Sequence, residues 1–132
     1  MKRRVYFTEN APAPIGPYNQ AIGYGGVLYV SGQIALHPQS GELHTASIEE
    51  ETRQVMENLR GILQDAAVDF PQVLKCTIFV RDMGMYSRIN EVYGSYFEHD
   101  AAPARELVEV AGLPKDVNVE ISCMAALHKE EE

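Results

Sequence analysis

The amino-acid sequence predicts an α+β fold in which two helices pack against one face of a β-sheet. The first observation is the order of the periodic segments, which runs strands, helix, strand, helix, strands along the chain. The second is a period-two alternation of apolar residues in the longest strand segments, beside three- and four-residue spacing in the helical ones. No internal repeat or linker-like stretch divides the 132 residues, so we expect one domain over residues 1–132.

The N-terminal part of the chain is predicted to hold three strands. Residues 4–7 form a short strand, and the proline-rich residues 10–17 form a loop because prolines exclude a helix there. Residues 20–22 and 27–34 are predicted as the strands of a hairpin, with a tight turn in the glycine-rich residues 23–26. These glycines lack the Lys-Ser/Thr ending of a phosphate loop and no helix follows them, so the hairpin interpretation is the stronger one.

The clearest helix begins after a capping signal. Ser47 and Glu50 have the S-x-x-E spacing of a capping box, and apolar residues recur at three- and four-residue steps from Ile48 to Ala66. The charged residues between them, Glu51 included, are predicted to form a solvated face. The other predicted elements are a second helix over residues 85–97 and strands over residues 74–80, 107–110 and 117–127.

Alternation along the predicted strands separates two faces of the sheet. One face is apolar and is expected to pack under the helices; its members are Leu28, Val30, Ile34, Leu74, Cys76, Ile78, Val80, Val119, Ile121, Cys123 and Ala125. The other face mixes apolar and polar residues, so it is too apolar to stay wet and too polar for a dry core. Because two helices cover only one side of such a sheet, the second face is a candidate subunit interface, and a homo-oligomer is predicted.

The charge and the cysteine content exclude several classes of protein. Eleven Lys and Arg against 19 Asp and Glu give a net charge of −8, which repels nucleic acid and anionic membranes. The apolar runs are too short for a membrane span, and the N-terminal residues lack the apolar stretch of a secretory leader, so a cytoplasmic protein is expected. Cys76 and Cys123 are predicted as buried apolar residues, and the four histidines lack metal-ligand spacing, so no metal is expected.

Two charged residues stand where strand patterns favour apolar ones. Glu120 is predicted at mid-strand on the mixed face, where a carboxylate is costly to bury unless it is paired or its pKa rises. Arg105 precedes the strand predicted at 107–110. A solvated charge for Arg105, and a structural salt bridge or an exposed edge position for Glu120, stay open as alternatives to a functional role. Spacing alone does not show that the two side chains meet.

Five ordered blocks of sequence carry a resemblance to a known family. They are residues 15–21 (IGPYNQA), 31–34 (SGQI), 103–105 (PAR), 113–115 (LPK) and 119–121 (VEI). Together these blocks resemble the RidA/YjgF family of reactive-intermediate deaminases. The resemblance covers residues 8–127, and residues 128–132 form an acidic tail outside it.

The resemblance implies a chorismate-mutase-like α+β fold, with a mixed sheet and two helices on one face, assembled as a homotrimer with ligand clefts between subunits. It also implies cofactor-free hydrolysis of 2-imino acids, such as 2-iminobutanoate and 2-iminopropanoate, to 2-oxo acids and ammonia. By the same resemblance, Arg105 binds the substrate carboxylate and Glu120 holds the attacking water. The residues it implies around the ligand are Tyr18, Ser31, Gly32, Asn90 and Leu107.

Two positions depart from the family pattern. Glu106 stands where the family has a small residue, and a carboxylate close to Arg105 would weaken anion binding. Leu107 stands where many active members carry Cys, and Leu is tolerated there if the position acts through its backbone. The alternative function is a non-catalytic trimeric protein that binds a small carboxylate such as a 2-oxo acid. A ribonuclease, another activity attached to this family, is disfavoured because the sequence has no basic patch with interleaved aromatic residues.

Overall fold

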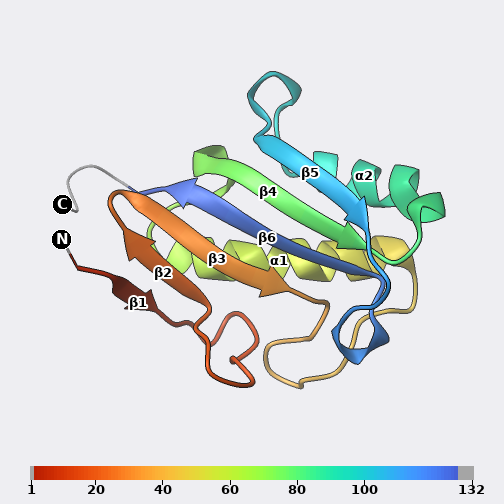
Figure 1. The fold of residues 1–132 in the computed structure, drawn as a ribbon, viewed down its shortest axis with the longest axis horizontal. Helices are drawn as coiled ribbons and strands as arrows, with labels where there is room; N and C mark the ends of the chain where they lie inside the picture. The colour runs from red at the N-terminus through yellow and green to blue at the C-terminus, as the bar shows by residue number, and fades with distance from the viewer. Residues whose placement is uncertain (1, 128–132) are drawn as a thin grey trace.

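The computed structural model describes residues 2–127, which form six strands and two α-helices linked by short 3₁₀ turns (Figure 1). The strands are β1 (Arg4–Tyr6), β2 (Ala21–Tyr24), β3 (Val27–Gln33), β4 (Val73–Val80), β5 (Ala104–Glu109) and β6 (Val119–Ala126). The helices are α1 (Ile48–Asp65) and α2 (Tyr86–Gly94). The 3₁₀ turns are η1 (Phe70–Gln72), η2 (Met83–Met85), η3 (His99–Ala101) and η4 (Pro114–Asp116).

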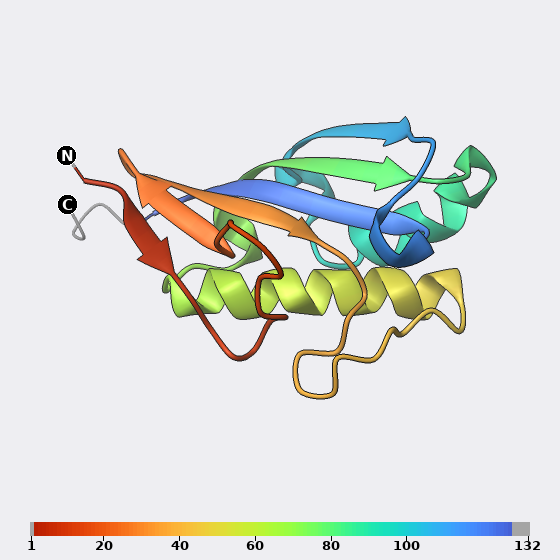
Figure 2. The same cartoon turned by 60° about the horizontal axis from the view of Figure 1, so that its bottom comes forward.

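The strands form one mixed sheet in the order β1-β2-β3-β6-β4-β5. The β4–β5 pair is parallel, and every other neighbouring pair is antiparallel. Figure 2 shows α1 running along beneath one face of this sheet. The core lies between that face and the helices, and this arrangement confirms the predicted α+β class with both helices on one side.

Helix α1 begins where the capping signal predicts. Ser47 Oγ accepts a hydrogen bond from the Glu50 N–H at 3.1 Å, which satisfies one of the free donors of the first turn. The predicted apolar stripe is buried from Ile48 to Leu63. One part of the prediction is wrong: Glu51, expected on the solvated face, has no exposed surface. Its carboxylate has partners in a distant segment of the chain, described below.

The predicted faces hold along β6 but fail at two other places. In β3 the pairing with β6 shifts between Val30 and Gln33, so Gln33 is buried and Ile34 is not in the core. In β4 a shift between Val73 and Lys75 puts Val73 in the core and leaves Leu74 49% exposed. The physical reason is the same in both cases, because one irregular residue in a strand breaks the alternation, so side chains before it and after it no longer follow one pattern.

The hairpin turn and the second helix are shorter than predicted, and one strand is longer. Gly25 and Gly26 are the two residues between β2 and β3, and both have a positive φ, as a tight two-residue hairpin turn requires. Helix α2 follows a 3₁₀ turn in which the Asp82 carboxylate accepts from the Gly84 N–H at 2.8 Å. Strand β5 begins at Ala104, three residues earlier than predicted, so Arg105 is a strand residue.

No helix among residues 2–127 covers the second face of the sheet, which carries exposed apolar side chains such as Tyr29 and Val108. This finding agrees with the mixed face that the sequence predicts, while the oligomer itself stays a prediction. Cys76 and Cys123 are buried and free, and burial raises the pKa of both thiols. Over the same described residues, no helix has both the length and the apolar character needed to cross a membrane.

Candidate functional site

Glu120 lies on the second face of the sheet, here called the open face because no helix among residues 2–127 covers it. Its side chain stands at the wall of a cavity of about 370 Å³. Its neighbours in β6, Val119 and Ile121, are fully buried under the helices, so strand alternation turns the Glu120 side chain the other way. The carboxylate is half-buried, and burial raises the pKa of Glu120 above the usual carboxyl range. A carboxylate in such surroundings is a better proton acceptor near neutral pH than an exposed one.

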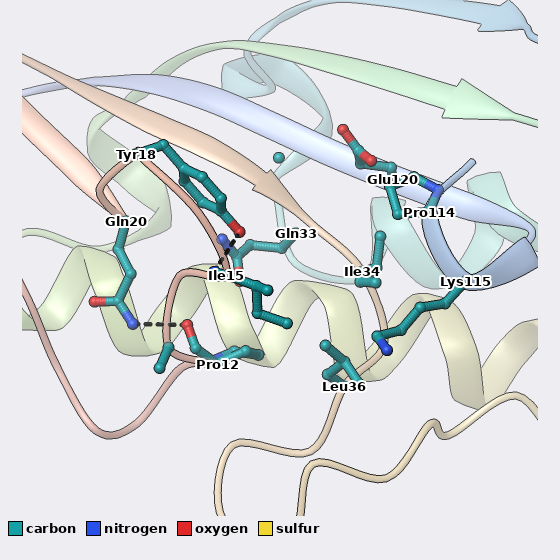
Figure 3. A pocket seen from close by; sticks show the side chains of 12 residues that line it. Pro12, Ile15, Tyr18, Gln20, Gln33, Ile34, Leu36, Pro114, Lys115 and Glu120 are labelled. Carbon is teal, nitrogen blue, oxygen red and sulfur yellow. Dashed lines mark hydrogen bonds between the residues drawn. The ribbon is translucent and has the colours of Figure 1, made fainter. Parts of the chain in front are cut away.

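Three segments far apart in the sequence wall this cavity (Figure 3). Ile15 and Tyr18 come from the N-terminal loop on one side, and Lys115 lies with Glu120 on the other. The residues that follow β3, Ile34 and Leu36, lie between them. Most of the surface that lines the cavity is apolar, and its two charged groups are the Glu120 carboxylate and the Lys115 ammonium group.

Gly32 makes room for Glu120. A Cβ atom placed on Gly32 would lie 2.9 Å from Cδ of Glu120 and closer still to one of its carboxylate oxygens. The family resemblance implies Gly32 only as a residue around the ligand, and the structure adds Glu120 as its close neighbour. The absence of a side chain at position 32 is thus what allows the Glu120 carboxyl group to lie where it does.

Tyr18 and Ser31 have different relations to the cavity. Tyr18 contributes to its wall, and its hydroxyl accepts a hydrogen bond from the Ile15 N–H at 3.3 Å, which ties the loop to itself. The hydroxyl of Ser31 donates to the carbonyl of Asn19 at 2.6 Å. Ser31 therefore links β3 to the loop that carries Tyr18, and it does not belong to the cavity wall.

Buried amides, which the sequence patterns do not predict as part of the site, hold two of the cavity walls in place. Nε2 of Gln20 donates to the carbonyls of Thr8, Ala11 and Pro12 at 2.9–3.2 Å, and Oε1 accepts from the Thr8 N–H. Nδ2 of Asn58 donates to the carbonyls of Ile34 and Leu36 at 3.0 and 2.9 Å. Both side chains are almost completely buried. The one signal in the sequence is an amide within an apolar stripe, since Asn58 adjoins Leu59 in α1.

Arg105 lies on the helix side of the sheet. It pairs with Cys76 of β4, whose side chain faces the core, and its guanidinium reaches α2. Nη1 donates to Oδ1 of Asn90 at 2.5 Å, and Nη2 donates to the Tyr86 hydroxyl at 2.9 Å. The guanidinium carbon also lies 5.2 Å from the centre of the Tyr93 ring, within cation–π distance. These contacts fix the plane of a cation while using two of its five N–H donors.

The two positions that depart from the family pattern point away from one another. Nζ of Lys75 lies 3.1 Å from Oε1 of Glu106, on the side of β5 opposite Arg105. Glu106 therefore does not weaken anion binding at Arg105 of the same chain, because strand alternation places the two side chains on opposite sides of β5. Leu107 is on the same side as Arg105, half-buried, and packs against the hydrophobic core.

Arg105 and Glu120 do not meet within one protomer. Arg105 faces the helices at the β5 edge of the sheet, whereas Glu120 faces away from them in β6. The residues that hold Arg105, Tyr86 and Asn90, line a separate cavity of about 480 Å³. Five of the seven site residues that the resemblance implies therefore fall into two groups. Tyr18, Gly32 and Glu120 line one cavity, while Arg105 and Asn90 form the second group.

Within residues 2–127, no group of three or more His, Cys, Asp or Glu side chains is placed to hold a metal ion. The charged groups of the Glu120 cavity are Glu120 itself and Lys115. The two groups of residues therefore offer different chemistry: the Arg105 guanidinium can bind an anion, and the Glu120 carboxylate can accept or donate a proton.

Comparison with known proteins places the chain in a family. The family model described as endoribonuclease L-PSP matches residues 8–127. The RutC family protein PH0854 of Pyrococcus horikoshii is 47% identical over 123 residues, which are 93% of this chain and 97% of that protein. A solved structure from Yersinia pestis, YyfA of the conserved Rid protein family, is 42% identical with a TM-score of 0.92, covering 96% of this chain and 100% of that one.

A second solved structure, TdcF of E. coli with bound serine, is 38% identical with a TM-score of 0.89 and covers 95% of this chain and 99% of that one. The fold, a six-stranded mixed sheet with two helices on one face, is thus the fold of these proteins. The sequence blocks around Tyr18, Gly32, Arg105 and Glu120 lie inside the matched region. The chain belongs to the RidA/YjgF family.

Proposed function

We propose that this protein hydrolyses reactive 2-imino acids, such as 2-iminobutanoate and 2-iminopropanoate, to 2-oxo acids and ammonia. The observation that carries the proposal is a half-buried carboxylate, Glu120, with a raised pKa at the wall of a cavity, in a family member that also retains Arg105. An imine carbon is already electrophilic, so the protein has to orient the substrate, position a water molecule and accept a proton.

In this proposal Arg105 binds the substrate carboxylate. A planar guanidinium presents two parallel N–H donors to a carboxylate, which fixes the orientation of the substrate as well as its charge. The bonds from Arg105 to Asn90 and Tyr86 support this role because they hold the fork in one plane before a ligand arrives. In a chain with a net charge of −8, anion binding depends on such a local concentration of positive charge.

Glu120 is proposed to act on the water. Its carboxylate accepts a proton as the water oxygen bonds to the imine carbon and the C=N electron pair moves to nitrogen, which then takes that proton to give the carbinolamine. The carboxylate next transfers the hydroxyl proton to the amino nitrogen, so that the C–N bond breaks, ammonia leaves and the C=O bond of the 2-oxo acid forms. General-base assistance of this kind contributes about 10²–10⁴-fold to a rate. Gly32 keeps the space for the carboxylate, and Tyr18 is proposed to line the ligand cleft. Ser31 and Leu107 are proposed to shape the cleft from behind, the latter through its backbone.

The proposed site needs two copies of the chain. Arg105 and Glu120 face opposite sides of the sheet, so one ligand reaches both only if a second protomer brings its Arg105 to the Glu120 cavity. We propose a homotrimer in which neighbouring protomers cover the open face of the sheet and form the clefts. The exposed apolar side chains of that face, Tyr29 and Val108 among them, support an interface there.

The activity is tested by generating 2-iminobutanoate in place with threonine dehydratase and trapping the remaining imine with semicarbazide. The wild-type protein is expected to hydrolyse the imine before it is trapped and so to lower the amount of semicarbazone that forms. Arg105→Ala is expected to reduce the rate of imine hydrolysis to background. Arg53→Ala removes the same charge from an exposed position of α1 and serves as the matched control. A wild-type rate in Arg105→Ala would refute the role of this guanidinium.

The sharing of sites between protomers has its own test. Arg105→Ala and Glu120→Gln chains are each expected to be inactive, whereas oligomers reassembled from a mixture of the two regain part of the wild-type activity. Such rescue arises because some interfaces then pair an intact Arg105 with an intact Glu120. Mixtures that stay inactive, while wild-type chains treated in the same way recover, would contradict a site shared between copies.

A second candidate function is binding without catalysis, in which the protein captures a small carboxylate such as a 2-oxo acid. The observation that favours it is the solved relative TdcF, whose structure holds bound serine, a small carboxylate ligand. A wild-type protein that is inert towards imines but binds 2-oxobutanoate would decide for this function. Nucleic acid is not a proposed partner because of the net charge of −8, and the two free thiols favour the cytoplasm as the compartment.

A further inference from the structure

Glu51 is a completely buried carboxylate whose partners all lie next to Glu120 in the sequence. One oxygen, Oε2, accepts the backbone N–H of Asn118 at 2.7 Å and that of Val119 at 3.1 Å. The other oxygen, Oε1, accepts Nδ2 of Asn118 at 2.8 Å. These bonds join the first turn of α1 to the start of β6, 67 residues further along the chain, immediately before Glu120.

The carboxylate of Glu51 has no ion-pair partner among residues 2–127. A carboxylate without a cation is costly to bury, and three N–H donors offset that cost. An apolar side chain would fill the same volume without the charge, but it would leave the N–H groups of Asn118 and Val119 without this acceptor. The carboxylate of Glu51 is therefore explained by the backbone N–H groups of Asn118 and Val119, which need it as a hydrogen-bond acceptor.

The same short segment is held from its other side by Arg81, which directly follows β4. The backbone N–H of Arg81 donates to the carbonyl of Asn118 at 3.1 Å, and Nη1 donates to the carbonyl of Asp116 at 3.0 Å. The segment before Glu120 is thus fixed between α1 and the end of β4. From that fixed point the Glu120 side chain extends to the cavity, where it packs against Gly32.

We propose that Glu51 is a positioning residue, which holds the start of β6 so that the Glu120 carboxylate keeps its place at the cavity wall. The consequence for catalysis rests on the proposed function, whereas the positioning of Glu120 does not. Glu51 itself does not contact a ligand in the cavity, since its side chain has no exposed surface.

Three variants separate positioning from stability. Glu51→Ala removes all three bonds. Glu51→Gln keeps one oxygen for the two backbone N–H groups, and its amide can donate to Asn118 once the Asn118 amide turns over. Leu63→Ala is the control, because Leu63 is equally buried in α1 but lies twelve residues away, about 18 Å along the helix. Leu63→Ala therefore lowers stability without touching the segment before Glu120.

Two readouts are measured beside urea unfolding: the kcat and KM of imine hydrolysis, and the titration of the Glu120 carboxyl carbon by ¹³C NMR. Glu51→Ala is expected to lower kcat by about 10²-fold with little change in KM, because a base displaced by about 1 Å loses that much. It is also expected to move the Glu120 titration towards the ordinary carboxyl range, because a loosened side chain gains solvent. Glu51→Gln is expected to restore both readouts, and Leu63→Ala is expected to change stability alone.

If the Glu120 carboxyl titrates with the same pKa in Glu51→Ala as in Leu63→Ala, Glu51 does not position Glu120. This result overturns the proposal whatever the activities of the two variants are. Lys115, the other charged group at the cavity, is the same in all variants and cannot account for a difference. If Glu51→Ala does not fold, Asn118→Ala, which removes only the bond to Oε1, takes its place under the same criterion. A wild-type protein inert towards imines would refute the proposed function, while the titration would still decide the role of Glu51.

Discussion

Replacing Gly32 by alanine tests whether the space beside Glu120 matters. The added Cβ would lie 2.9 Å from Cδ and 3.0 Å from Cγ of Glu120, whereas carbon atoms in contact stay about 3.5–4.0 Å apart. The carboxyl group therefore has to move by about 0.5–1 Å. Gly32 does not have a positive φ, so its backbone accepts an alanine without strain, and the three atoms nearest the added Cβ all belong to Glu120.

The expected effect is large on activity and small on stability. Displacement of a catalytic group by about 1 Å costs about 10²-fold in rate, so kcat for imine hydrolysis is expected to fall by that factor. Overpacking costs about 1–3 kcal/mol, and the lower end applies here because the half-buried Glu120 side chain can rotate towards solvent. The KM value is expected to change little, since Arg105 is untouched.

The assay is the semicarbazide trap for kcat and KM, together with urea unfolding for stability. Gly112→Ala is the control, because Gly112 has no atoms within 4 Å of the added Cβ and no positive φ. A Gly32→Ala protein with the kcat of Gly112→Ala would show that Glu120 does not act from the place it occupies here. A fall in stability without a fall in kcat would lead to the same conclusion.

Three further variants test the site and its support. Burial raises the pKa of the Glu120 carboxyl above its value in the unfolded chain, so the folded chain binds the carboxyl proton more tightly. The free energy of unfolding therefore falls as the pH rises through the folded pKa. Glu120→Gln is expected to flatten this pH dependence in urea unfolding and to be more stable than the wild type at pH 7. Asn58→Ala is expected to lower the free energy of unfolding by about 1–3 kcal/mol for each of the carbonyls of Ile34 and Leu36 left unpaired, an effect that denaturant unfolding measures. Leu107→Cys is expected to leave kcat unchanged, because this side chain packs against the core on the helix side; a large gain in the imine assay would contradict a backbone role.

Regular elements were predicted well where the pattern of apolar residues repeats without interruption. The stripe of α1 and the alternation of β6 report which side chains share a face, and both are confirmed. The prediction fails near the irregular residues of β3 and β4 because a single shift in strand pairing breaks the alternation between the side chains before it and those after it. A signal was available in β3, since a glycine inside a strand, here Gly32, often marks such an irregularity.

The candidate site was only partly predictable for a related reason. Arg105 and Glu120 stand in recognisable sequence blocks, but their placement on opposite faces depends on where β5 begins and on its parallel pairing with β4. The sequence predicts Glu51 on the solvated face because it lies among charged residues at the start of a helix. Its burial depends on N–H donors of Asn118 and Val119, which enter only after 67 residues of intervening chain.

The sequence alone determined the α+β class, the first helix with its cap, the alternating strand β6 and the family, because each of these rests on local periodicity or on ordered blocks of residues. The tertiary structure decided which polar residues are buried, that Gly32 leaves room for Glu120, and that Arg105 and Glu120 are separated by the sheet. Those facts arise where strand register and long-range hydrogen bonds bring distant segments together, and local spacing carries no record of such contacts.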